Sequence, residues 1–199
     1  LTYLYSNTVG HATQHGGPKH THAAVDTDNK IIFIGQENLG YTYKYTNTEL
    51  TFVNANGPGD TAFGLGNGTN GECRHMRIDM EERLLFVGTE EDGLRIYHYQ
   101  TDGTVLNETE KNFNISGEQN GVALDTEYKL VFIGKYSGNK IQVAKYESPE
   151  NPDDMNSSFQ ISQIGGEISL QGSYANAAPT LEVDPINKIL FARSRTDST

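Results

Sequence analysis

The chain has 199 residues, a formal net charge of −11 and a hydrophobic fraction of 35%. A phosphate-binding surface needs a basic patch, so this acidic balance argues against nucleic acid or an anionic membrane as a partner. No apolar run is long enough for a membrane-spanning helix, and the single cysteine excludes an internal disulfide framework. The acidic, lysine-poor, loop-rich composition favours an extracellular or cell-surface location.

Four segments along the chain share one pattern, in which an aspartate is followed by a polar turn and an apolar run. They are VDTDNKIIFIG from Val25, IDMEERLLFVG from Ile78, LDTEYKLVFIG from Leu124 and VDPINKILFAR from Val183. The aspartate is suited to capping the turn, and the apolar run predicts a strand that is covered on both faces. A further strand is expected after each of the first three, at 41–45, 94–99 and 140–146.

With a short strand that ends at the aspartate and a weaker segment before the next repeat, each repeat has four short antiparallel strands, which is typical of a β-propeller blade. We therefore predict an all-β propeller of four-stranded antiparallel blades, with about three and a half blades in this chain. A β-sandwich is the alternative, although a sandwich does not require the same aspartate-to-phenylalanine spacing to recur four times.

The predicted organisation is a single propeller domain or fragment over 1–199. Its parts are a strand and loop from a preceding blade at 1–22, blades at 23–75, 76–121 and 122–180, and a half blade at 181–199. The incomplete last blade favours part of a larger propeller. The alternative is a four-bladed ring in which residues 1–7 complete that blade.

Three stretches of the chain resemble the seven-bladed lactonase propellers, a family that includes 6-phosphogluconolactonases and carboxymuconate lactonizing enzymes. They are GGPKHTHAAVD (16–26), ECRHMRIDMEERLLFVGTEED (72–92) and LEVDPINKILFARSRTDS (181–198). The resemblance implies that Arg74 and Arg195 hold the carboxylate or phosphate of a lactone, because a guanidinium binds such anions bidentately. It also implies that His20 or His22 and Glu90 are the acid and base candidates.

The stretch from Gly71 to Tyr97 also resembles one blade of the β-propeller phytases. This resemblance implies calcium ions held by Glu90, Glu91 and Asp92, whose carboxylate oxygens are suitable hard ligands. The equivalent turns in the other repeats are polar as well, so solvated charge is the simpler interpretation of Glu91 and Asp92.

Two further groups of residues have weak functional interpretations. Four sequons are candidate glycosylation sites, at Asn67, Asn107, Asn114 and Asn156, in about the number that chance predicts for this composition. Four histidines at 11–22 are interpreted as part of a loop that leads into the first blade, with His20 and His22 on one face of its inner strand, rather than as a zinc site.

The predicted function is that of an extracellular binding or assembly module without a complete catalytic set. The alternative is a lactonase-like hydrolase acting on an anionic sugar or carboxylate lactone, and a third hypothesis is a calcium-dependent, phytase-like phosphatase. We expect no required cofactor, with calcium needed only for the third hypothesis. The expected partner is a protein, a second copy of the chain or a small anionic ligand. The fold alone does not select among these functions.

Overall fold

The computed structural model describes residues 21–36, 39–53, 63–64, 73–89, 93–105, 111–113, 119–135, 139–154, 158–170 and 179–193. Within these ranges the regular structure consists of sixteen β-strands in four antiparallel sheets, without a helix. The prediction of an all-β protein built of four-stranded antiparallel sheets is therefore confirmed. No helix long and apolar enough to cross a membrane occurs in the part of the chain that the structure describes.

Each sheet is an antiparallel meander in which strands that are consecutive in sequence lie side by side. The first sheet contains β1 (Thr21–Asp26), β2 (Ile31–Gln36), β3 (Leu39–Tyr45) and β4 (Leu50–Val53), with the short β5 (Phe63–Gly64) paired to β3. The second contains β6 (Cys73–Asp79), β7 (Leu84–Thr89), β8 (Leu94–His98) and β9 (Lys111–Phe113). The third contains β10 (Gln119–Asp125), β11 (Leu130–Lys135), β12 (Lys140–Tyr146) and β13 (Ile161–Gln163), with β14 (Ile168–Ser169) paired to β12. The fourth contains β15 (Thr180–Asp184) and β16 (Ile189–Arg193).

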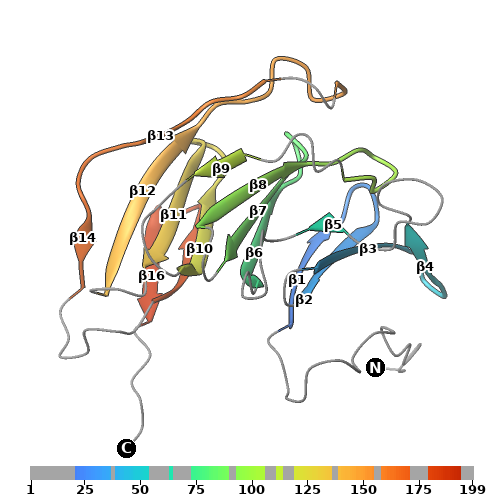
Figure 1. The fold of residues 1–199 in the computed structure, drawn as a ribbon, viewed down its shortest axis with the longest axis horizontal. Coiled ribbons are helices and arrows are strands. Elements are labelled where there is room, and N and C mark those ends of the chain that lie inside the picture. Colours follow the sequence, from blue (N-terminus) through green and yellow to red (C-terminus); the bar gives the residue numbers. More distant parts are fainter. Residues whose placement is uncertain are drawn as a thin grey trace, which may run out of the picture.

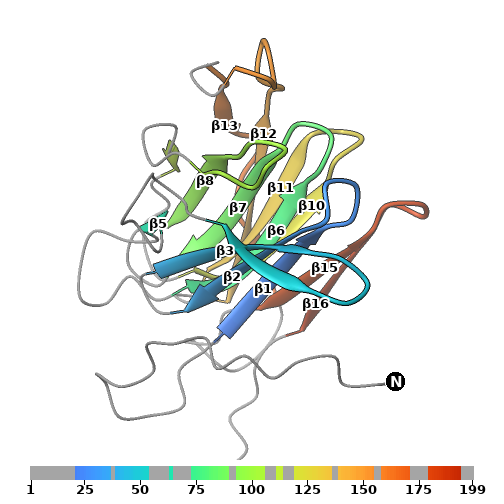
Figure 2. The ribbon, with the colours of Figure 1, turned by 90° about the vertical axis from the view of Figure 1, so that its right-hand side faces the viewer.

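The first strand of each sheet packs against the first strand of the next. Contacts run from β1 to β6, from β6 to β10 and from β10 to β15. Figures 1 and 2 show the sheets following one another in chain order with these strands on the inner side. Successive propeller blades are arranged in this way. The described residues form an open series of such sheets and not a closed ring.

The hairpin that joins the first two strands has the same construction in all four sheets. An aspartate ends the first strand and its Oδ1 accepts backbone amides of the turn, as in the 2.9 Å bonds from Asp28 and Asn29 to Asp26. The fourth residue after the aspartate is left-handed, with φ between 51° and 60°, at Lys30, Arg83, Lys129 and Lys188. The capping role predicted for the repeated aspartates is therefore confirmed.

Burial decreases along the series of sheets at equivalent positions of the second strands. Ile31 and Leu84 are fully buried, whereas their equivalent Ile189 in the fourth sheet is 47% exposed. Phe33 and Phe86 are fully buried, whereas the equivalent Phe191 is 57% exposed. The described residues thus cover the second strands of the first two sheets and leave that of the fourth sheet open.

Candidate functional site

Two of the residues implied by the lactonase resemblance, His22 and Arg74, lie near the start of adjacent first strands. His22 is the second residue of β1 and Arg74 is the second residue of β6. The pairing of β6 with β7 shifts register between Cys73 and His75, which places Arg74 in a bulge. Bulges of this kind change the direction in which a side chain points, and they are frequent beside binding sites.

His75 stands where His22 stands in the first sheet, and the two imidazoles are in contact. Both are paired to the glycine that recurs in the repeat pattern, His22 to Gly35 and His75 to Gly88. The ring centroids are 5.7 Å apart, with an edge-to-face angle of 75°. His75 is not among the predicted site residues, although the sequence carries a signal for it: each histidine precedes the repeated aspartate by four residues.

The surroundings of His75 keep its ring neutral. Burial, together with the nearby charges of Arg77 and His22, lowers the pKa of His75 to about 3. The backbone amide of Val122 in β10 donates to its Nδ1 at 2.8 Å, so the single proton of the neutral ring is on Nε2. His75 therefore presents an N–H donor of fixed direction near the start of β6, and it is poorly suited to act as a base.

Cys73 begins the same strand and is fully buried. Burial raises the pKa of its thiol to about 12, although a backbone hydrogen bond from His75 and the charge of Arg74 act in the opposite direction. Its Sγ would lie 2.5 Å from a Cβ placed on Gly35, so close packing with the first sheet requires glycine there. A buried thiol that stays protonated in this way is a poor nucleophile.

One further charged pair joins the first strands of non-adjacent sheets. The guanidinium of Arg77 in β6 forms an ion pair with the carboxylate of Glu182 in β15. Arg77 also donates to the carbonyl of Met76 at 3.0 Å. These contacts hold Arg77 within the chain, between β6 and β15.

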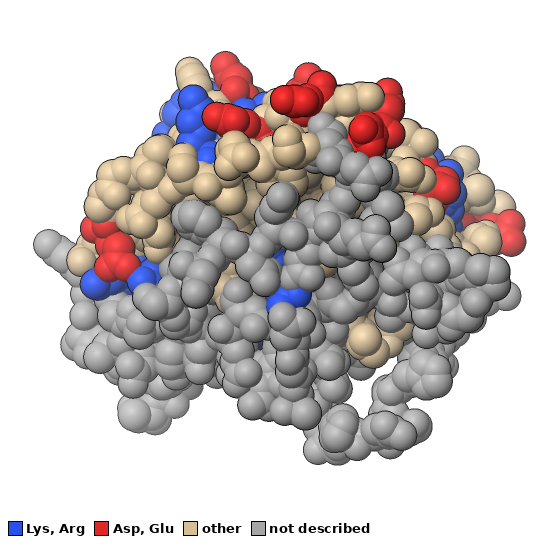
Figure 3. Space-filling view, turned by 45° about the horizontal axis from the view of Figure 1, so that its top comes forward, with Lys and Arg blue, Asp and Glu red and all other residues tan. Residues whose placement is uncertain are grey.

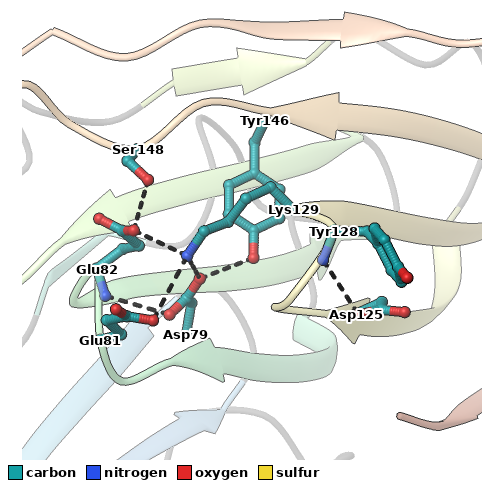
Figure 4. A network of polar contacts seen from close by, with 8 residues as sticks. All are labelled: Asp79, Glu81, Glu82, Asp125, Tyr128, Lys129, Tyr146 and Ser148. Carbon is teal, nitrogen blue, oxygen red and sulfur yellow. Dashed lines mark hydrogen bonds and ion pairs between the residues drawn. The ribbon is translucent and has the colours of Figure 1, made fainter. Parts of the chain in front are cut away.

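A buried polar network connects the second and third sheets at their hairpin edge (Figure 4). The ammonium of Lys129 lies 2.8 Å from Glu82 and 3.1 Å from Asp79, and the hydroxyl of Tyr146 donates to Asp79 at 2.8 Å. Burial alone would lower the pKa of Lys129, but the hydrogen bonds to Glu82 and Asp79 raise it. Burial and the Asp79 carboxylate raise the pKa of Tyr146, so this phenol stays protonated and serves as a donor. The network holds the second and third sheets together, and its polar groups bond to one another.

The other predicted site residues lie outside the described part of the chain. They are His20, Glu90 and Arg195 of the lactonase-like set, Glu91 and Asp92 of the calcium set with Glu90, and the sequon residues Asn67, Asn107, Asn114 and Asn156. Those sets therefore stay predictions. Within the described ranges there is no group of three or more His, Cys, Asp or Glu side chains that could hold a metal ion. On the face shown in Figure 3, the acidic side chains of the described residues lie in several separate places.

No protein-family model and no curated protein matches this chain. Among solved structures, it is similar to the extracellular domain of a hybrid two component system from B. thetaiotaomicron, with 18% sequence identity and a TM-score of 0.47. It is also similar to a protein from Lactobacillus plantarum, with 8% identity and a TM-score of 0.44. The first match covers 89% of this chain and 21% of that chain, and the second covers 87% and 63%. The chain thus spans less than two thirds of either neighbour's length.

Proposed function

We propose that this chain is part of an extracellular β-propeller that binds a small carboxylate-bearing ligand where the first strands begin. The observation that carries the proposal is the contact between His22 and His75 on adjacent strands, with Arg74 beside them. The open series of sheets and the exposed fourth sheet support a larger propeller. The acidic, lysine-poor composition supports the extracellular location.

The residues at this edge are chemically suited to hold an anion without reacting with it. A guanidinium forms strong, charge-assisted hydrogen bonds to a carboxylate. A neutral imidazole with its proton on Nε2 adds a donor whose direction is fixed by the bond from Val122 to Nδ1. Because the pKa of His75 is far below neutrality, this ring does not exchange protons at physiological pH. Binding is therefore favoured over acid–base chemistry for the described part of the site.

Gluconate, an anionic sugar acid, is the probe for this proposal. Imidazole NMR resonances of His22 and His75 should shift during a gluconate titration and saturate. The variant Arg74→Gln should bind gluconate about tenfold or more weakly, since it loses a charge-assisted bond. The matched control is Lys145→Gln, which removes one exposed positive charge from β12 and should change the affinity less than about twofold. Equal affinities in the two variants would overturn the proposal.

A lactonase-like hydrolase is the second candidate. It is favoured by one observation, namely that His22 and Arg74, two of the residues implied by the resemblance, lie on adjacent first strands. Hydrolysis of gluconolactone should then be faster with the protein than without it, and should be slowed strongly by Arg74→Ala and by Glu90→Gln. Rates that are the same in all three proteins would remove this candidate.

A further inference from the structure

Two successive boundaries between sheets are closed by the same contact. At the first, Tyr99 donates its hydroxyl to Asp26 at 2.8 Å and packs its ring on Phe33, with centroids 4.8 Å apart. At the second, Tyr146 donates to Asp79 at 2.8 Å and its ring lies 4.8 Å from that of Phe86. In each case the later sheet supplies the tyrosine, and the earlier sheet supplies the aspartate and the phenylalanine. Both tyrosines are fully buried.

The tyrosine is held in the same way by its own sheet. It ends or follows the third strand, and its amide donates to the carbonyl of the left-handed residue of the hairpin. These bonds run from Tyr99 to Arg83 at 3.0 Å and from Tyr146 to Lys129 at 2.9 Å. Tyr45 makes the equivalent 2.9 Å bond to Lys30, so all three third strands present a tyrosine at one position.

At the third boundary the aspartate and the phenylalanine are present, and a cavity lies where the tyrosine would be. The cavity has a volume of about 230 Å³ and includes Asp125, Lys188, Phe132, Leu130, Val183 and Leu190 in its lining. Asp125 is buried, and the ammonium of Lys188 lies 3.3 Å from its Oδ2, much as Lys129 lies 3.1 Å from Asp79. No described residue of the fourth sheet donates a hydroxyl to Asp125.

The strand beside this cavity is open to pairing. Among the described residues, β16 pairs with β15 and with no third strand. Its Ile189 and Phe191 are 47% and 57% exposed, whereas the equivalent residues of the first two sheets are fully buried. An exposed edge strand with apolar side chains is a template for the addition of another strand.

We propose that this cavity is a binding site for a tyrosine side chain carried at the end of an extended peptide strand that adds antiparallel to β16. The peptide amide would donate to the carbonyl of Lys188, the ring would pack on Phe132, and the hydroxyl would donate to Asp125. The occupant is a peptide strand with the chemistry of β12, in which alternating apolar residues precede the tyrosine. This site is separate from the edge that holds His22, Arg74 and His75, and it does not depend on the anion-binding proposal.

The test uses the nine-residue peptide NKIQVAKYE, which copies residues 139–147, and a version with phenylalanine in place of its tyrosine. Their affinities for the full chain are compared by anisotropy of a fluorophore at the peptide N-terminus. The tyrosine peptide should bind about tenfold more tightly, because its hydroxyl bonds to a buried carboxylate. This preference should disappear in Asp125→Asn and persist in Asp184→Asn, a variant at the equivalent turn outside the cavity.

A preference for the tyrosine peptide that survives Asp125→Asn would overturn the proposal. Residues 2–8, TYLYSNT, share the pattern of residues 42–48, TYKYTNT, so the titration is repeated on Tyr5→Phe. Tighter binding of the tyrosine peptide to that variant would support the site and assign its occupant to the chain's own N-terminal residues. Absence of a tyrosine preference in both chains would overturn the proposal.

Discussion

The repeated aspartates all cap a turn, but they differ in whether they also bind residues of the next sheet. Asp79 and Asp184 both end a first strand and cap the turn that follows. Asp79 also receives Tyr146 and Lys129 from the next sheet, whereas the bonds recorded for Asp184 come from its own turn, from Ile186 and Asn187. The cap is therefore a local structure, and the link between sheets depends on the tyrosine and the lysine that the next sheet supplies.

Removing the hydroxyl of Tyr146 tests the strength of that link. Tyr146→Phe should lower the free energy of unfolding by about 1.5–3 kcal/mol, because a buried carboxylate loses a hydrogen-bond donor. Tyr128→Phe is the matched control, since this side chain is 55% exposed and should change stability by less than about 0.5 kcal/mol. Urea unfolding followed by circular dichroism measures both. Equal effects of the two substitutions would show that the buried bond contributes nothing.

The pH dependence of stability reports on His75. In the unfolded chain its imidazole takes up a proton below about pH 6.5, whereas in the folded protein its pKa is about 3. The unfolded state thus binds more protons between these values, so stability is present above pH 6.5 and is lost as the pH falls. His75→Gln should make the free energy of unfolding less steep between pH 4.5 and 6.5. An unchanged slope would show that His75 accepts a proton in the folded state.

At the scale of single residues, the sequence predicted the turn aspartates correctly because a capped turn is a local structure. It did not show that Val122 donates to His75, because this bond joins residues that are 47 positions apart. The contact of Tyr146 with Asp79 spans 67 positions and was equally invisible. Alignment of the repeats on their aspartates would have placed His22 and His75 at one position, and it is the signal to use in such chains.

At the scale of elements, the apolar runs and the third strands were predictable because their pattern repeats and their residues are buried. The predicted third strands at 41–45, 94–99 and 140–146 correspond to β3, β8 and β12. The outer strands β4, β9 and β13 are only three or four residues long, and β5 and β14 have two. Such short elements leave little hydrophobic pattern in the sequence.

The close approach of the third and fourth sheets makes a prediction about Gly121. A Cβ on this residue would lie 2.2 Å from the carbonyl oxygen of Pro179, so the two sheets would have to separate. Gly121→Ala should therefore destabilise the protein by about 1–3 kcal/mol. Gly166→Ala is the control, because nothing lies within 4 Å of its added methyl group. Thermal unfolding of both variants decides the matter, and similar midpoints would contradict this packing.

At the scale of the whole molecule, the sheets form an ordered series whose later members are progressively less covered. The buried Phe33 and Phe86 and the exposed Phe191 occupy equivalent positions. A terminal unit of a repeat protein normally has a polar outer face. The apolar residues of β16 therefore indicate a surface made to be covered. The sequence predicted the repeat, but the number of sheets in a ring depends on the angles between sheets, which the repeat pattern does not encode.

One repeated tyrosine–aspartate contact joins the first sheet to the second and the second to the third. A double-mutant cycle at the first boundary tests it most directly, using Asp26→Asn, Tyr99→Phe and the combined variant in urea unfolding. We expect a coupling free energy of about 1–3 kcal/mol between these residues, and additive effects when Tyr99→Phe is combined with Asp184→Asn. Additivity within about 0.5 kcal/mol for Asp26 and Tyr99 would contradict it.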